Sequence, residues 1–319
     1  MPHTVLIARD FDHLSDLAAD ATRAHIARTL ERQDTFNLGL ATGHSPTGAY
    51  RRLIQAFNRR AIPAEKVRTF NLDEYVGLPG ADAQARVLHP ESYTYFMIQE
   101  LFGPLHPKFA ATHLPAGCLI DQPTLERELD AHPGDWKTLG ADNGQAIRIH
   151  YDAASSYLQW VRQDILRSYL QAITDAGGID LHLIGIGKRG HVAFHEVGIP
   201  FQSDPMLLVK LDDDTIECAI QAGHFTSRQA SPRFAISMSA ELIFRARAVI
   251  LLATGASKAA PIAASLLEDP SPAIPASYAQ IYAQRGGDIT YLLDLDAAAD
   301  VLAHRDAITA RGIHLEDLT

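Results

Sequence analysis

The chain has 319 residues, of which 47% are hydrophobic and 21% charged, a composition that can bury a large core and excludes disordered and fibrous classes. Its formal net charge of -10 argues against nucleic acid and anionic membranes as partners, although a small anion can still bind through local donors. Two cysteines are too few for a disulfide framework, and the sequence has neither a membrane-spanning apolar stretch nor the features of a signal peptide. We therefore expect a cytoplasmic protein.

Short β-rich runs alternate with helix-period segments along the chain. The runs are residues 5–8, 36–40, 67–72, 181–186, 234–238, 249–253 and 289–293. Apolar residues at helical spacing mark the segments 15–32, 46–57, 91–101, 153–176 and 257–268, the first with Ser15 as a residue type suited to a helix cap. This alternation predicts an α/β fold built from βαβ units around a mostly parallel sheet flanked by helices.

The periodic pattern weakens between Cys118 and Tyr151, where turn-rich stretches at 132–136 and 140–144 interrupt it. We find no internal repeat and no low-complexity tract. The sequence therefore predicts a single domain over residues 1–319, with an elaborated surface insertion at about 119–150.

The second β-rich run leads into a glycine-bearing loop and then a helix. Thr42, Gly43 and Ser45 lie in this loop, and Pro46 stands in the early turn of the helix, where the first amide groups are unpaired anyway. Free N–H groups and the positive end of the helix dipole make such a terminus an anion site, and the hydroxyls of Ser45 and Thr47 add donors. The alternative is an ordinary strand-to-helix turn in which Ser45 only caps the helix.

Asp73 and Glu74 follow the third run directly. The carboxyl ends of strands in open α/β sheets are the usual place for ligands, so either carboxylate is a candidate general base. A solvated turn or the start of a helix is the alternative for this pair.

The fourth run ends in a glycine-rich loop that delivers His191, with Glu196 five positions later. A histidine changes charge near neutral pH and suits proton transfer, and a carboxylate can orient it or stabilise its cation. His191 and His195 also have a spacing that metal ligands use, but a glycine-rich loop does not supply the helix that would align them. We therefore expect no metal; a purely structural histidine is the other alternative.

Lys258 lies at the start of the helix that follows the run 249–253. A cation at a helix N-terminus opposes the helix dipole, so this position costs free energy unless the lysine binds an anion. An exposed lysine without a ligand is the alternative.

Together these stretches resemble the glucosamine-6-phosphate deaminase family, within the group that also includes 6-phosphogluconolactonases. The resemblance spans about residues 36–293, and the stretches NLDEYVGLP at 71–79 and HPESYTYFM at 89–97 look like deaminase signatures that the lactonases lack. It implies a Rossmann-like sheet and conversion of glucosamine 6-phosphate and water to fructose 6-phosphate and ammonia. The implied partner is a small sugar phosphate, with no cofactor or metal, and homo-oligomer formation stays open.

The resemblance also implies roles for the acid and base groups. Asp73 resembles the base that moves a proton between C2 and C1 of the opened sugar. His191 resembles the residue that assists opening of the pyranose ring, and Glu196 its carboxylate partner.

For the phosphate, Lys258 resembles the family's phosphate-binding lysine, and Thr42, Gly43 and Ser45 match the loop that holds the sugar phosphate. The family's phosphate-binding arginine is expected between residues 214 and 225, a stretch that contains no arginine here. Arg228 and Arg233 are then the candidates in the sequence nearby, and neither is established by it.

A second departure concerns Arg189, which stands where the family loop normally reads Asp-Gly-His. A cation near His191 should lower the pKa of that histidine and alter ring opening. Alternatively, Arg189 points outward or grips an acidic substrate group, which makes it a candidate specificity residue. Two other functions stay open: hydrolysis of a sugar-phosphate lactone, with His191 activating water, and catalytically silent binding of a sugar phosphate.

Overall fold

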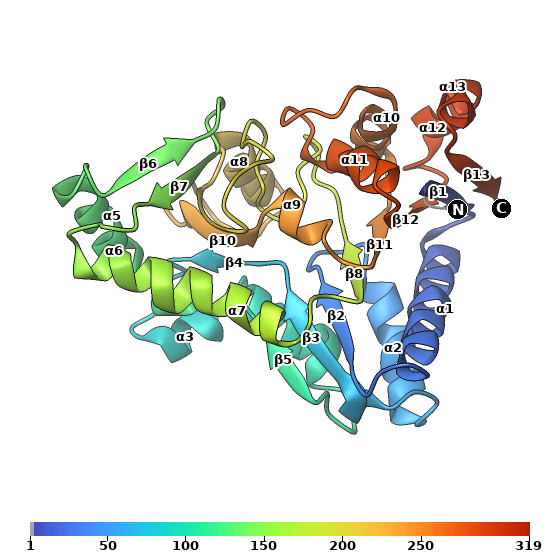
Figure 1. Ribbon diagram of the computed structural model, residues 1–319, viewed down its shortest axis with the longest axis horizontal. Coiled ribbons are helices and arrows are strands. Elements are labelled where there is room, and N and C mark those ends of the chain that lie inside the picture. The colour runs from blue at the N-terminus through green and yellow to red at the C-terminus, as the bar shows by residue number, and fades with distance from the viewer. Residues whose placement is uncertain (1–2) are drawn as a thin grey trace.

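A parallel sheet runs through the centre of the computed structural model, which describes residues 3–319 (Figure 1). Its strands are β1 (His3–Ala8), β2 (Phe36–Leu40), β3 (Val67–Asn71), β5 (Ala111–His113), β8 (Leu181–Ile184), β11 (Ala248–Ala253), β12 (Asp288–Asp294) and β13 (His314–Asp317). They stand in the order β13-β1-β12-β11-β8-β2-β3-β5, and every pairing is parallel. The α/β fold with a mostly parallel central sheet is therefore confirmed.

A second sheet of five strands is antiparallel and lies beside the first, on the left of Figure 1. Its strands, in spatial order, are β4 (Asp73–Val76), β10 (Phe234–Met238), β9 (Met206–Lys210), β7 (Gln145–Ile149) and β6 (Trp136–Leu139). The sequence analysis did not predict this second sheet, because a short apolar run such as 234–238 does not reveal which sheet it joins. The segment 119–150 supplies β6 and β7, and β7 pairs with β9.

The helices connect these strands in chain order, and the five helical segments predicted from the sequence are all present. They are α1 (Phe11–Leu30), α2 (Thr47–Asn58), α3 (Ala83–Val87), α4 (Tyr93–Met97), α5 (Gln122–Ala131), α6 (Ser156–Trp160), α7 (Ser168–Asp175), α8 (Asp213–Gln221), α9 (Ala240–Ile243), α10 (Ala259–Leu267), α11 (Tyr278–Gln284), α12 (Ala299–Ala303) and α13 (Arg305–Ala310). Short 3₁₀ turns are η1 (Ala64–Lys66), η3 (Gly117–Leu119), η5 (Ala256–Lys258) and η6 (Pro275–Ser277), and π-helical turns are η2 (Ile98–Phe102) and η4 (Val161–Arg167). Within residues 3–319, no helix is both long and apolar enough to cross a membrane.

The start of α1 differs from the sequence-based expectation. The helix begins at Phe11, and Asp10 caps it by accepting a hydrogen bond of 2.8 Å from the His13 N–H. Ser15 lies inside the helix, where its hydroxyl donates to the Phe11 carbonyl, so it is not the cap.

Helices cover both faces of the parallel sheet, which explains why its strands are continuous apolar runs rather than alternating ones. Alternate residues of β11 belong to opposite hydrophobic clusters. Ile250 shares a cluster with Leu53 of α2, whereas Leu251 shares the other with Ile173 of α7.

The chain passes from one sheet to the other at Leu72. Its N–H donates to the Leu40 carbonyl of β2 at 3.2 Å, and its carbonyl accepts from the Met238 N–H of β10 at 2.8 Å. Asp73, the next residue, therefore begins β4 at the junction of the two sheets.

Between strands β2 and β8, the direction in which the chain adds strands to the parallel sheet reverses. From β2 the chain continues outward to β3 and β5, whereas from β8 it continues in the opposite direction to β11 and β12. Loops at the carboxyl ends of two such strands diverge and leave a crevice, the usual place for a ligand in an open α/β sheet.

Gly39 of β2 permits the close packing of β2 against β8. A Cβ atom at this position would lie 1.4 Å from Cδ2 of His182, the paired residue on β8. His182 is fully buried, and its Nδ1 lies 2.8 Å from the Ile243 carbonyl oxygen, so the ring has little room to retreat.

We predict that Gly39→Ala lowers the free energy of unfolding by about 1–3 kcal/mol, because the added methyl overpacks the contact with His182. Urea denaturation measures this difference. Gly134→Ala is the matched control, since a Cβ there meets nothing within 4 Å. Equal losses of unfolding free energy in the two variants would show that the contact with His182 does not determine the cost of Gly39→Ala.

Candidate active site

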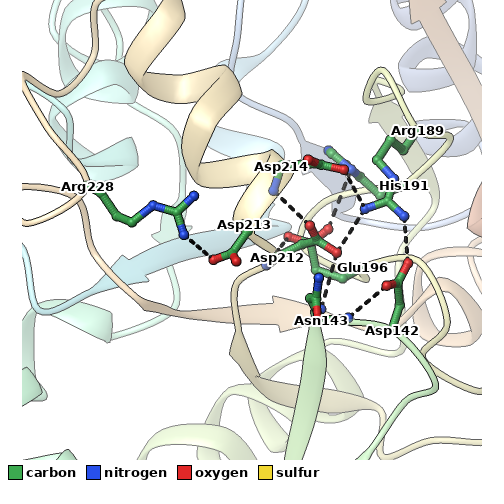
Figure 2. A network of polar contacts seen from close by, with 10 residues as sticks. Asp142, Asn143, Arg189, His191, Glu196, Asp212, Asp213, Asp214 and Arg228 are labelled. Carbon is green, nitrogen blue, oxygen red and sulfur yellow. Dashed lines mark hydrogen bonds and ion pairs between the residues drawn. The ribbon is translucent and has the colours of Figure 1, made fainter.

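A cavity of about 700 Å³ lies at the carboxyl ends of the central strands, where the crevice is expected. Six of the residues proposed from the sequence line it: Thr42, Gly43, Ser45, Asp73, His191 and Lys258. Glu196 and Arg189 are not lining residues, but they lie close to His191 (Figure 2). The fold therefore brings together loops that follow β2, β3, β8 and β11.

The loop after β2 presents an uncapped helix N-terminus to this cavity. Gly43 has a φ of 93°, in the left-handed region that favours glycine, and α2 begins without a side-chain hydrogen bond to its first N–H groups. The Ser45 hydroxyl lies 3.2 Å from the Thr254 hydroxyl instead of capping the helix. The interpretation of Ser45 as a simple cap is therefore wrong, and the terminus can accept an anion.

Glu74 is a structural carboxylate. It accepts hydrogen bonds of 2.8–3.0 Å from Ser92 Oγ, the Tyr93 N–H, and the N–H and hydroxyl of Thr94, at the start of α4. Asp73 points to the other side of β4, and no hydrogen bond to its carboxylate is found among residues 3–319. Of the two adjacent carboxylates, only Asp73 is thus available to a ligand.

Burial determines the protonation behaviour of Asp73. Removal from water raises the pKa of its carboxyl well above the ordinary range, and the negative charge of Glu74 adds to this shift. A carboxylate in this environment is a stronger base than one in water. Asp73 can therefore accept a proton from a bound molecule more readily than an exposed aspartate can.

A tight turn places His191 against the backbone. The Gly187 N–H donates to the His191 carbonyl at 2.9 Å, and Gly190 has a φ of 84°. A Cβ on Gly187 would lie 2.0 Å from His191 Nε2, so the glycine allows the ring to pack directly on the turn. Ala193, which also lines the cavity, has a φ of 49°, a strained conformation of the kind that clusters at functional sites.

His191 and Glu196 form a loose pair. Nδ1 of His191 is buried without a hydrogen-bond partner among the described residues and lies 3.7 Å from Oε2 of Glu196. Burial, with smaller effects of the Lys258 and Arg189 charges, lowers the pKa of His191 to about 4. Burial also raises the pKa of Glu196 to about 7. The imidazole is therefore neutral near pH 7, and Glu196 titrates there.

His195 has a purely structural environment. Its Nδ1 accepts from the Ala240 N–H at 3.0 Å, and its Nε2 lies 3.0 Å from the Ile199 carbonyl oxygen. Both nitrogens are thus engaged by the backbone and cannot join His191 in binding a metal ion. Within residues 3–319, no group of three or more potential metal-binding side chains is found.

Arg189 lies in a cluster of carboxylates (Figure 2). Its Nη2 is 2.6 Å from Asp142 Oδ2, and its Nη1 is 2.9 Å from Asp212 and 3.1 Å from Asp214. Asp142 comes from the loop between β6 and β7, whereas the other two stand at the start of α8. Carboxylates of the chain itself therefore balance the charge of Arg189.

This cluster, which consists of Arg189, Asp142, Asp212 and Asp214, is connected to His191 through Glu196. The Asp212 N–H lies 3.3 Å from Glu196 Oε1, and the Asp212 side chain is only 1% exposed. The cluster thus holds in place the Asp212 N–H, which donates a hydrogen bond to Glu196, and Glu196 in turn faces His191.

Lys258 reaches across to the loop after β8. Its Nζ donates to the Ile186 carbonyl at 2.6 Å. Burial and the positive charge of Lys188 lower its pKa, so an anion in the cavity would stabilise the charged form. The interpretation of Lys258 as a freely exposed lysine is therefore wrong.

Two charged pairs at the cavity were missed by the sequence analysis. Arg51 of α2 lies 3.7 Å from Glu100, and His224 lies 2.7 Å from Glu91. Arg51 follows the glycine-bearing loop by one helical turn, and this spacing is the signal that would have revealed it. Arg228 instead pairs with Asp213 at 2.5 Å (Figure 2), and Arg233 pairs with Glu126; neither lines the cavity.

Comparison with known proteins agrees with this geometry. The family described as "Glucosamine-6-phosphate isomerases/6-phosphogluconolactonase" matches residues 138–287. A glucosamine-6-phosphate deaminase from Clostridioides difficile (strain 630) is 31% identical over 302 residues, which cover 95% of this chain and 98% of that protein. One from Clostridium botulinum (strain Loch Maree / Type A3) is 30% identical over 295 residues, covering 92% and 97%.

Solved structures show the same fold. A monomeric glucosamine-6-phosphate deaminase superposes with a TM-score of 0.67 at 26% identity, covering 93% of this chain and 99% of that one. A 6-phosphogluconolactonase from Trypanosoma brucei gives a TM-score of 0.60 at 17% identity, covering 94% and 98%, which is a likeness of fold. By sequence identity and coverage, the chain belongs to the glucosamine-6-phosphate isomerase/6-phosphogluconolactonase family.

Proposed function

We propose that this protein is a glucosamine-6-phosphate deaminase, which converts glucosamine 6-phosphate and water to fructose 6-phosphate and ammonia. The observation that carries the proposal is the free, buried Asp73 carboxylate in one cavity with His191 and an uncapped helix N-terminus. Proton transfer between carbon atoms needs such a base, whereas hydrolysis of a lactone has no carbon-bound proton to move. The relatives named above as deaminases, at 30–31% identity, support the same choice.

The phosphate of the substrate binds where the donors converge. Thr42, Gly43 and Ser45 border the N-terminus of α2, and Lys258 reaches the same cavity from η5. Arg51 replaces the arginine that was expected between residues 214 and 225. Its side chain is 64% exposed, and the distance of 3.7 Å to its acidic partner Glu100 makes this ion pair a loose one. The Arg51 side chain can therefore turn to a phosphate at a small cost in free energy.

The remaining groups perform the chemistry in sequence. Neutral His191 accepts the proton of the anomeric hydroxyl and returns it to the ring oxygen as the ring bond breaks. Asp73 then takes the proton from C2 and delivers it to C1 while a second proton passes from the amino nitrogen to O1, which converts the amino aldehyde into the imine of a ketose. Water adds to that imine, and the carbon–nitrogen bond breaks to release ammonia and leave fructose 6-phosphate.

We predict equal amounts of ammonia and fructose 6-phosphate from glucosamine 6-phosphate, with kcat lowered at least ~100-fold in Asp73→Asn, since the amide cannot accept the proton. Coupled assays for both products measure this. Asp34→Asn, at an exposed position, is the control and keeps full activity. Hydrolysis of 6-phosphogluconolactone without ammonia release would identify a lactonase instead, and ligand-induced stabilisation without turnover a silent binder.

We predict an acidic limb in the pH profile of kcat/KM with a midpoint near pH 7, because Glu196 must be ionised to stabilise positive charge on His191. Activity then rises as pH rises through the pKa of Glu196, since burial holds this group neutral below it. In Glu196→Gln, the limb with this midpoint disappears. If both proteins kept the same midpoint, Glu196 would not be the group that titrates.

We predict that Arg189→Asp lowers both stability and activity, although it introduces the residue that the family usually carries. The change adds a carboxylate to Asp142, Asp212 and Asp214 and removes their shared cation, which destabilises the cluster that supports Glu196. Arg189→Lys retains the charge without the forked geometry and should fall between that variant and wild type. Thermal unfolding and kcat/KM measure the series; wild-type values for Arg189→Asp would contradict the role assigned to the cluster.

A further inference from the structure

A second cavity of about 490 Å³ lies away from the candidate active site and shares none of its lining residues. Residues of β6, β7 and the start of β9 line it on one side, and residues of η4 and α7 line it on the other. In Figure 1, the helical run α6–η4–α7 passes below β6 and β7. Its volume is within the range of small-molecule sites in proteins. Nothing in the proposed deaminase reaction uses it.

The charge of this second cavity is opposite to that of the chain. Lys137, Arg148, Arg162 and Arg167 line it, against the two acidic residues Asp152 and Asp204. The excess of two positive charges occurs on a protein whose formal net charge is -10. Such a concentration of cations favours an anion of about two negative charges.

Part of this positive charge has no partner in the chain. Lys137 stands directly opposite Arg148 in the β6–β7 hairpin, a like-charge pairing that is unfavourable without a counter-charge. Asp204 accepts from Arg148 at 2.8 Å, whereas Lys137 and Arg167 form no ion pair within residues 3–319. An anion between these side chains would relieve the repulsion.

Arg162 and Tyr151 form a cation–π pair at the edge of the cavity. The Arg162 guanidinium carbon lies 4.7 Å from the centre of the Tyr151 ring, and Tyr151 is 79% exposed. Arg162 Nε is buried without a hydrogen-bond partner among the described residues. Arg162 also belongs to the π-helical turn η4, a feature that often occurs at functional sites. A planar ring can stack on either side chain of this pair.

The interior wall of the cavity is apolar. It consists of Ile147, Ile149, Leu166, Leu170 and Met206. A sugar phosphate would have to place its ring hydroxyl groups against this wall without partners, which costs free energy. In a nucleoside phosphate, the face of the planar base can lie on this wall, with the polar edge of the base and the ribose hydroxyl groups directed to the open side and the phosphate among the cations.

We propose that this cavity binds a nucleoside monophosphate. The base packs on the apolar wall beside Tyr151 and Arg162, and the phosphate lies among Lys137, Arg148 and Arg167. A phosphate monoester carries about -1.5 to -2 charges near pH 7, which balances the excess in the cavity. The proposal concerns a binding site that is separate from the proposed deaminase reaction and does not depend on it.

Calorimetric titration of the full chain with AMP, GMP, CMP and UMP tests this proposal. We expect at least one of them to bind once per chain, at least tenfold tighter than its nucleoside alone or inorganic phosphate alone. Arg162→Met and Arg167→Gln, both in η4, should each weaken binding at least tenfold. Arg28→Met, at an exposed position of α1, should leave it unchanged, and thermal unfolding shows whether each variant is folded.

Lys258→Met distinguishes the two cavities. It should leave nucleotide binding unchanged while it weakens binding of glucosamine 6-phosphate, so failure of either proposal is seen separately. Absence of binding by all four nucleotides would overturn the proposal. Binding that Lys258→Met removes and Arg162→Met retains would also overturn it, because the nucleotide would then occupy the active site.

Discussion

The backbone of Leu72 joins the two sheets, and the candidate site depends on this junction. One hydrogen bond ties its N–H to Leu40 of the parallel sheet, and another ties its carbonyl to Met238 of the antiparallel sheet. Asp73 follows at once, so its carboxylate is positioned by both sheets rather than by a flexible loop. The loops that hold His191 and Lys258 come from neighbouring strands of the parallel sheet, so strand spacing sets how far apart these loops begin.

Burial is the dominant electrostatic effect in this region. It raises the pKa of Asp73 and Glu196 and lowers that of His191 and Lys258, so each group is moved toward its neutral form. Burial also raises the pKa of Glu74, although hydrogen bonds from Tyr93, Thr94 and Ser92 oppose that shift. The phosphate of the proposed substrate would bring charge into the cavity, and its binding should therefore be linked to the protonation of these groups.

Much of the fold could be predicted from the sequence, because buried parallel strands are apolar runs and their helices have a clear period. The strands of the second sheet were mostly missed: β6 has little apolar character, and β4 overlaps the carboxylates at Asp73 and Glu74. The loops that line the cavity could be predicted from the sequence. The distinct environments of these two carboxylates could not, because they depend on α4. The partners of Arg189 were equally hidden, since Asp142 and Asp212 are 47 and 23 residues away.

The residue that position 189 tolerates depends on the three aspartates that surround Arg189. An arginine there without Asp142, Asp212 and Asp214 would be a partly buried cation beside His191, and the three aspartates without the arginine would repel one another. Substitutions at these positions should therefore be strongly epistatic, tolerated as a set and harmful one at a time. Any series of single substitutions that exchanges an acid for an arginine in this loop should therefore have a narrow order of permissible steps, in which a partner carboxylate arrives no later than the cation.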